Sequence, residues 1–138
     1  MKVSRSARFK IIFLVLYIGG FLTYVLLYSK PKYQKLLKKH RITTGYTYDY
    51  APGTSYKNSP PSIYYKYYVD NTEFTGSTQL NDISATVIQA KLIFKYFPVA
   101  FDSSDFSNSE MLISPTTFTK FGLKYPDSLN WVLKLIDK

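Results

Sequence analysis

The hydrophobic pattern changes period along the chain, and its first feature is an apolar run over residues 11–28. These 18 residues, IIFLVLYIGGFLTYVLLY, contain no charge. A helix of this length spans about 27 Å, close to the roughly 30 Å of a bilayer's hydrocarbon core. No small-x-small cleavage site follows the run. We therefore predict one uncleaved transmembrane helix, Ile11–Tyr28, behind a basic tail of residues 1–10.

A basic neck over residues 29–41 follows the apolar run. Tyr33, Leu36, Leu37 and His40 recur at helical spacing, so we expect an amphipathic helix lying along lipid head groups or, alternatively, a solvated neck. The cations expected to contact the head groups are Lys30, Lys32, Lys35, Lys38, Lys39 and Arg41.

Within the predicted span, Gly19 and Thr23 form a small-xxx-small pair. Such a pair permits close approach of a second helix, but glycine is common in membrane helices, and a monomeric anchor is favoured over a homo-oligomer.

Strict alternation begins in the remaining residues, 42–138. Ile63, Tyr65, Tyr67 and Val69 face one way along Ile63–Asp70, which predicts a strand. Asp70 and Asn71 tolerate positive φ, and a return strand from Glu73 would complete a hairpin. Further strands are predicted at Tyr46–Tyr50, at Phe97–Phe101 and at Met111–Ile113, with a Pro, Gly and Ser loop over Ala51–Pro61. Pro98 indicates an edge strand or a strand start.

Helical signals occupy the gaps and the end of this domain. Asp82 or Ser84 can cap a helix that runs toward Phe94 with Ala85, Ile88 and Leu92 on one side. Ser114 can cap a short helix with Pro115 at its first position and Gly122 past its end. A last helix from Asp127 or Ser128 would pack Leu129, Trp131, Val132, Leu133 and Ile136 on the sheet. The predicted fold is mainly β (α+β): a small antiparallel sheet or barrel of about five strands with short C-terminal helices.

Charge is distributed unevenly, which changes the meaning of the net +9. Residues 1–41 carry ten cations and no acid, whereas residues 42–138 carry eight lysines against nine acids, a net charge of −1. Cations beside an apolar helix favour a membrane partner, and a near-neutral fold argues against nucleic acid. We expect a single-pass bacterial inner-membrane protein with a periplasmic domain. A literal count of four cations before the span and six after it favours the cytoplasmic alternative.

Several short motifs follow one another in this domain, namely VDNTEF, YFPVAF, a polar loop, EMLISP and FGLKYPDSLNW. In the order of these motifs the chain resembles a group of short, uncharacterised bacterial proteins with an N-terminal membrane anchor. This group is classified as a domain of unknown function. The resemblance implies a similar anchored β domain and no particular activity.

Catalytic side chains are scarce. Cysteine is absent, and His40, the single histidine, lies in the basic neck, which excludes a histidine triad or histidine metal site in the domain. The glutamates, Glu73 and Glu110, are not brought together by any pattern. The acidic segment Asp102–Asp105 lacks the ligand spacing of a calcium loop and is interpreted as a solvated turn. We therefore expect no metal or cofactor.

Tyrosine is the unusual feature of the composition, at 14 residues. Aligned on one sheet face, tyrosines form an aromatic surface for a glycan, a peptide or a partner protein. The alternative is that tyrosine simply suits half-buried strands. The residues of this predicted surface are Tyr46, Tyr48, Tyr50, Tyr64 and Tyr68.

Two functions fit these features. The first is a non-enzymatic, membrane-anchored accessory or protein-interaction module of the bacterial envelope, of which an immunity-type protein is one version. The alternative is an envelope glycan-binding domain or weak hydrolase that uses the tyrosine surface and a carboxylate such as Glu73.

Overall fold

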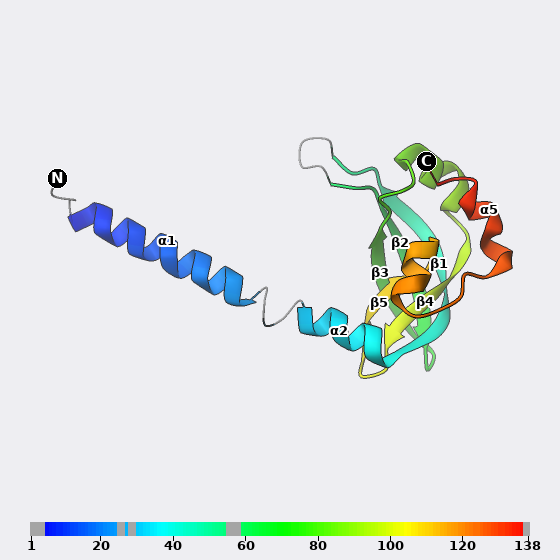
Figure 1. Cartoon of the computed structure of the whole chain (residues 1–138), viewed down its shortest axis with the longest axis horizontal. Coiled ribbons are helices and arrows are strands. Elements are labelled where there is room, and N and C mark those ends of the chain that lie inside the picture. The colour runs from blue at the N-terminus through cyan, green and yellow to red at the C-terminus, as the bar shows by residue number, and fades with distance from the viewer. Residues whose placement is uncertain (1–4, 25–26, 28–29, 55–58, 137–138) are drawn as a thin grey trace. The chain divides into compact units, whose positions relative to one another are not determined.

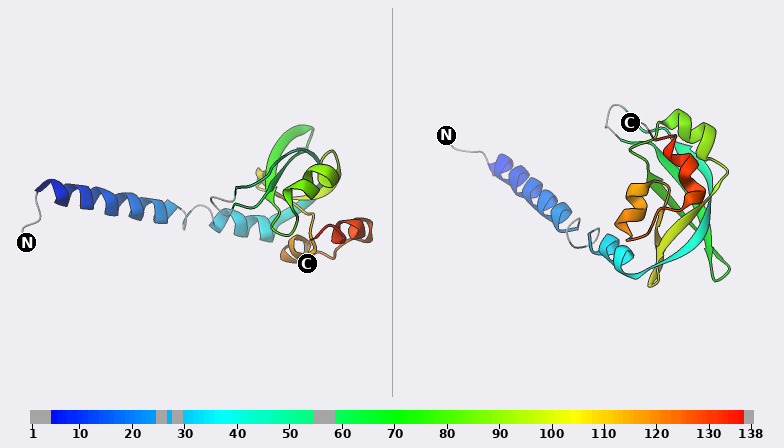
Figure 2. Two further views of the ribbon diagram at one scale, coloured as in Figure 1. Left: turned by 90° about the horizontal axis from the view of Figure 1, so that it is seen from above. Right: turned by 45° about the vertical axis from the view of Figure 1, so that its right-hand side comes forward.

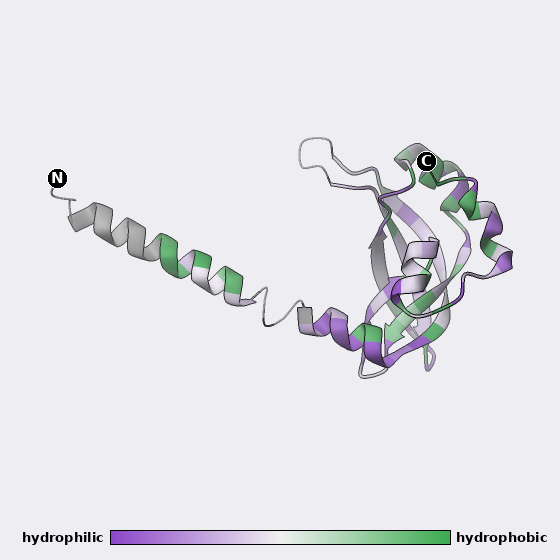
Figure 3. Ribbon diagram, viewed as in Figure 1, coloured by the Kyte–Doolittle hydropathy of each residue, from purple (hydrophilic) through white to green (hydrophobic). Residues whose placement is uncertain are grey.

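The computed structural model describes residues 5–24, 27, 30–54 and 59–136. The chain forms two compact units, Met1–Lys35 and Leu36–Lys138. The first unit contains α1 (Arg5–Tyr24), whose apolar side chains from Leu14 to Tyr24 are all exposed. Figure 3 shows the hydrophobic colouring of this part of the helix. No helix among the described residues is both long and apolar enough to cross a membrane. Three residues of the predicted span, Val25, Leu26 and Tyr28, lie outside the described residues.

The second helix, α2 (Lys30–Lys39), ends inside the second unit. Leu36 is buried in the core, and Leu37 packs against it. The His40 Nδ1–H donates to the carbonyl oxygen of Leu37 at 3.0 Å, and its ring meets the Phe121 ring edge-on at 5.1 Å. The last turn of the predicted neck therefore belongs to the domain, because its apolar face is used in the core rather than left for lipid.

A five-stranded antiparallel sheet with strand order β3-β2-β1-β4-β5 forms the second unit (Figure 1). This confirms the expectation of a mainly β domain with an antiparallel sheet of five strands and short helices. The strands are β1 (His40–Ala51), β2 (Ser62–Val69), β3 (Thr72–Gln79), β4 (Tyr96–Asp102) and β5 (Asp105–Met111).

The β2–β3 hairpin follows its sequence pattern closely. Asp70 and Asn71 occupy the turn with φ of 49° and 62°, which matches the twist of a two-residue hairpin. Ile63, Tyr65 and Tyr67 are fully buried, while the residues between them face outward. Alternation was sufficient here because the strand has one buried and one solvated face.

Strands β4 and β5 differ from their predicted forms. Strand β4 lies between β1 and β5, so Pro98 is not on an edge strand. The carbonyl oxygen of Pro98 accepts a hydrogen bond from Leu112 N at 2.8 Å, so both the oxygen and the nitrogen of Pro98 point toward β5. The β4–β5 pairs begin only at Val99, so the missing N–H of Pro98 interrupts no pair of this ladder. The predicted loop after Asp102 is strand β5, which ends at Met111 rather than beginning there. The sequence of β5 lacks hydrophobic alternation because β5 is an edge strand with many partly exposed side chains, so the strand was not predicted.

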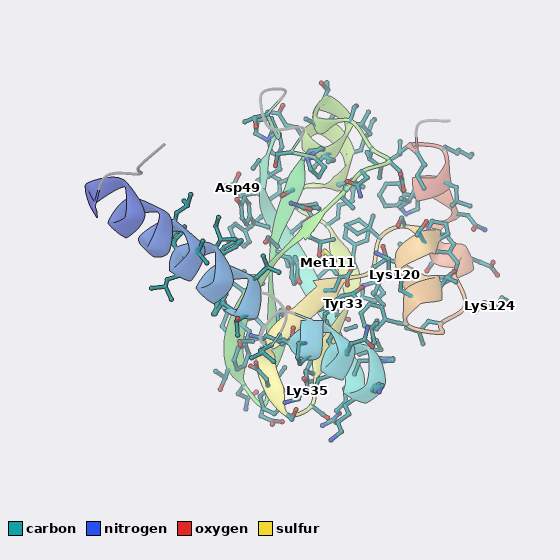
Figure 4. The ribbon with its side chains drawn as sticks, turned by 60° about the vertical axis from the view of Figure 1, so that its left-hand side comes forward. Tyr33, Lys35, Asp49, Met111, Lys120 and Lys124 are labelled. Atoms are coloured by element: carbon teal, nitrogen blue, oxygen red, sulfur yellow. The ribbon has the colours of Figure 1, made fainter. Side chains whose placement is uncertain are left out.

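The sheet curls until its two edge strands, β3 and β5, lie alongside each other, which makes it nearly a barrel. Side chains close the gap: Met111 N–H donates to Thr78 Oγ1 at 3.0 Å, and the Tyr67 hydroxyl donates to the Phe106 carbonyl. The Tyr65 ring crosses the interior above Gly76, where a Cβ atom would lie 2.6 Å from the ring. Figure 4 shows Met111 among the interior side chains.

Short helices complete the domain (Figure 2). As predicted, the Ser114 side chain caps the helix Pro115–Lys120 by accepting a hydrogen bond from Thr117 N, and Gly122 follows this helix with φ of 67°. The predicted helix toward Phe94 is shorter and passes into a π-helical turn, with Ile88 and Leu92 buried. In the last helix Val132 is buried, whereas Leu133 is 43% exposed. These elements are α3 (Ala85–Val87), η3 (Ile88–Leu92), α4 (Pro115–Lys120), η4 (Asp127–Leu129) and α5 (Asn130–Leu133).

Candidate functional site: an aromatic groove

An open groove of about 620 Å³ lies where the turn before β4 meets the start of α5. Figures 1 and 2 show these two segments, distant in sequence, at the same end of the domain. Phe94 and Tyr96 are each 69% exposed, which is unusual for large aromatic side chains. We call this site the aromatic groove; its lining residues are Lys91, Phe94, Lys95, Tyr96, Ser128, Leu129 and Trp131.

Two sets of aromatic rings flank the groove. The Tyr46 ring centroid lies 5.0 Å from that of Tyr96 and 6.4 Å from that of Phe94, because Tyr46 and Tyr96 pair directly across β1 and β4. On the other side, Trp131 lies 6.2 Å from the buried ring of Phe97. The core therefore supports Trp131 on one side of the groove, whereas Phe94 and Tyr96 on the other side are largely exposed.

Thr47 fixes the turn that presents Phe94 and Lys95. Its side chain is fully buried, and its hydroxyl lies 2.6 Å from Leu92 O and 3.0 Å from Lys95 O. The hydroxyl oxygen also accepts from Lys95 N at 2.9 Å, and the Thr47 carbonyl accepts from Phe94 N at 2.9 Å. Thr47 thus provides hydrogen-bond partners for the backbone groups of residues 92–95, which lie in a turn outside the strands.

Phe94 adopts a strained backbone conformation at the rim of the groove. Its φ of 61° lies in the left-handed region, which costs a residue with a Cβ about 1–2 kcal/mol. A bulky residue in this region, exposed to solvent, gains little packing in return. Strain of this kind persists where the surrounding structure imposes it, and it is concentrated at binding sites.

The groove is cationic. Lys91 and Lys95 line it, and no acidic residue is present among the described lining residues. The Lys95 ammonium lies 6.0 Å from the centroid of the Trp131 ring, within range of a cation–π contact.

The predicted tyrosine surface is only partly assembled. Tyr46, Tyr64 and Tyr68 face outward; Tyr46 packs against the groove rings of Tyr96 and Phe94 but does not itself line the groove. A register shift between Thr47 and Asp49 places Tyr48 in a bulge and turns Tyr50 toward the core, where it packs. The five tyrosines therefore do not share one face, because the extra residue reverses the alternation beyond it.

The predicted carboxylate, Glu73, lies on the outer sheet face rather than in the groove. It accepts a hydrogen bond from the Tyr68 hydroxyl and pairs with the Lys66 ammonium at 3.6 Å. The Tyr68 hydrogen bond holds the pKa of Glu73 below its usual range, and the Lys66 charge lowers it further. Glu73 is not among the described residues that line the groove. Glu73 is thus an ionised surface group, poorly suited to donate a proton.

The predicted head-group cations Lys35, Lys38, Lys39 and Arg41 are exposed, Lys32 is partly exposed, and the Lys30 side chain lies outside the described set. The Thr23 hydroxyl donates to the Gly19 carbonyl within α1 at 2.7 Å. Among the described residues no cluster of His, Asp or Glu could hold a metal. These positions carry no geometry that identifies a ligand.

Sequence analysis missed most of the groove. Alternation with Phe97, Val99 and Phe101 already indicates that Tyr96 faces outward, and this signal was available. Nothing in the sequence indicates that Trp131 lies beside Lys95, or that Thr47 holds the turn. Comparisons of this chain with protein-family models, with curated proteins and with solved structures returned no match, so its function has to be argued from this geometry.

Proposed function

We propose that this protein is a non-enzymatic interaction module of the bacterial inner membrane that binds a partner protein through the aromatic groove. The observation that carries the proposal is the exposed aromatic cluster, presented on a strained turn that buried Thr47 holds in place. Rigid, exposed aromatic residues are the usual anchors of protein interfaces. An immunity-type protein is one version of such a module.

Membrane anchoring is the second part of the proposal. It is supported by the uncharged run Ile11–Tyr28 and by the exposure of every described apolar side chain from Leu14 to Tyr24. A helix that is apolar all round needs an apolar environment. The cations on both sides of the run fit anionic lipid head groups, with the domain in the periplasm.

The groove offers no catalytic arrangement among its described residues. Ser128 and Tyr96 provide hydroxyl groups, but the described lining contains neither a carboxylate nor a histidine to activate them. The paired carboxylates of a glycoside hydrolase are missing from the same set. Binding without chemistry is therefore the function that this site supports best.

The experiment is co-purification of the full-length chain from the membranes of its own host after mild solubilisation. Tyr96→Ala removes an exposed groove ring, and Tyr68→Ala removes an exposed ring of the outer sheet face as the matched control. We expect a stoichiometric partner with the wild type and with Tyr68→Ala, and at least about a fivefold loss of it with Tyr96→Ala. Equal recovery with all three chains would refute the groove as the interface.

The anchor is tested separately by washing the membranes with alkaline carbonate. The full-length chain should stay in the membrane pellet, because an apolar span is not released by removing peripheral contacts. Release into the supernatant would contradict the anchor without bearing on the groove.

A further inference from the structure

The charge of the aromatic groove identifies the kind of partner segment that fits it. Resting on the function proposed above, we propose that the groove binds an acidic segment of the partner protein, with an apolar or aromatic side chain between its carboxylates. The rings would take the apolar side chain, and the two lysines would pair with the carboxylates on each side of it.

Two observations support an anionic ligand. Lys91 and Lys95 stand in a domain whose residues 42–138 carry a net charge of −1, so the groove is a local cationic site on a near-neutral fold. Neither lysine forms an ion pair with any described residue, in contrast to Lys66, which is paired with Glu73. Unpaired cations beside aromatic rings attract carboxylates through complementary potential.

The position of Lys95 also allows its ammonium to leave the Trp131 ring and pair with a carboxylate of the ligand. It lies over the Trp131 ring rather than against a carboxylate, and a cation–π contact at an exposed site is worth only about 0.5–1 kcal/mol. A carboxylate of the ligand can therefore draw the ammonium away from the ring. Trp131 is the only tryptophan of the chain, so its fluorescence reports this movement.

Lipid and sugar fit the groove less well than a peptide. A concave site of about 620 Å³ suits a short chain segment better than a planar bilayer. The Phe97 ring centroid lies 6.2 Å from that of Trp131, which restricts stacking of the Trp131 ring on a sugar.

The test is a titration of Trp131 emission in the full-length chain, held in an uncharged detergent. The probe is a capped five-residue peptide with phenylalanine between two acidic residues on each side. Two further peptides keep the phenylalanine but replace the acidic residues with serine or lysine. We expect saturable binding of the acidic peptide, at least about tenfold weaker binding of the serine peptide, and none of the lysine peptide. Binding of the acidic peptide should weaken between about 50 and 300 mM salt.

Protein variants identify the cations responsible. The double variant Lys91→Gln, Lys95→Gln should weaken binding of the acidic peptide at least about tenfold. Lys124→Gln is the matched control, since Lys124 is exposed and lies outside the groove lining, on the loop after α4 (Figure 4). This control should bind within about twofold of the wild type. Circular dichroism of each variant verifies that the fold is retained.

Three results would overturn the proposal: no binding of the acidic peptide, equal binding of the serine peptide, or binding unaffected by the double variant. A saturable response to an acidic oligosaccharide or to anionic vesicles, with none to the peptide, would assign the groove to that ligand instead. If the peptide titration fails, co-purification of a partner can still depend on Tyr96. The two experiments therefore test the acidic-segment proposal and the proposed interaction function independently.

Discussion

The outer sheet face and the aromatic groove both carry exposed aromatic residues, but they are built differently. On the outer face, Tyr68 and Glu73 bond to each other across neighbouring strands, and Lys66 neutralises the carboxylate. In the groove, Tyr96 and Phe94 lie beside lysines that have no described carboxylate partner. On the outer face these three side chains pair with one another, whereas Lys91 and Lys95 in the groove have no ion-pair partner among the described residues.

This difference shows why tyrosine content alone did not identify a site. Alternation places aromatic rings on a solvated face for reasons of strand preference, and cross-strand pairs then stabilise them. A binding site is indicated instead by groups that remain exposed, strained or unpaired in the folded chain. The following predictions test this contrast, from the largest expected effect to the smallest.

Loss of the hydroxyl of Thr47 should be the most damaging change. Thr47→Val leaves the buried Leu92 O and the part-buried Lys95 N without their hydroxyl partner, which should lower the free energy of unfolding by about 2–4 kcal/mol. Urea unfolding measures this loss. Thr44→Val, at an exposed position of the same strand, should cost less than about 0.5 kcal/mol. Similar losses in the two variants would show that Thr47 does not hold the turn.

The interior tyrosine should make stability fall at alkaline pH. Burial raises the pKa of Tyr65 to about 12, so its folded form keeps its proton while the unfolded chain ionises near 10. The stabilisation is therefore complete below pH 10 and is lost as pH rises toward 12, by about 2–3 kcal/mol. Urea unfolding at several pH values measures the slope. Tyr65→Phe should flatten it, and an unchanged slope in that variant would contradict this assignment.

Phe94 should lower the stability of the fold while its ring contributes to partner binding. Phe94→Gly relieves the positive φ, whereas Phe94→Ala keeps it, so the glycine variant should be more stable than the alanine variant by about 0.5–1 kcal/mol. Both variants lose the ring and should recover less partner. Thermal unfolding and co-purification give the two readouts. An alanine variant as stable as the glycine variant would show that the turn is unstrained.

The hydroxyl of Tyr68 should matter least. Tyr68→Phe removes the main cause of the lowered pKa of Glu73, so that pKa should rise toward its usual range in an NMR titration. The lowered pKa favours folding above the usual carboxyl range, and this contribution disappears as pH falls. It is small because the pair is exposed. Partner recovery should not change, and a loss of partner would move the interface to the outer face.

Local rules predicted the local elements well. The Asp70–Asn71 hairpin and the Ser114 cap with Gly122 each depend on a few neighbouring residues with a definite conformational preference. The strand at Ile63–Asp70 and the near-barrel of five strands followed from alternation and domain size. The bulge at Tyr48 and the polar edge strand β5 were missed, because neither leaves a hydrophobic signature.

The groove could not be predicted for a further reason. Its two sides are residues 91–96 and 128–131, and only the closed fold brings them together. Of the predicted tyrosines, Tyr46 is the one that packs against a groove ring, since its neighbour on the next strand is Tyr96. Knowledge of that pairing would have been needed to infer the site.

Site-specific photocrosslinking in native membranes tests the central claim most directly. A photoreactive phenylalanine analogue would replace either Tyr96 or Tyr68 in the full-length chain, each exposed on its own surface. The account predicts one discrete adduct from position 96, lost when Lys91 and Lys95 are replaced by glutamine, and none from position 68. An adduct from position 68 with none from position 96 would contradict it.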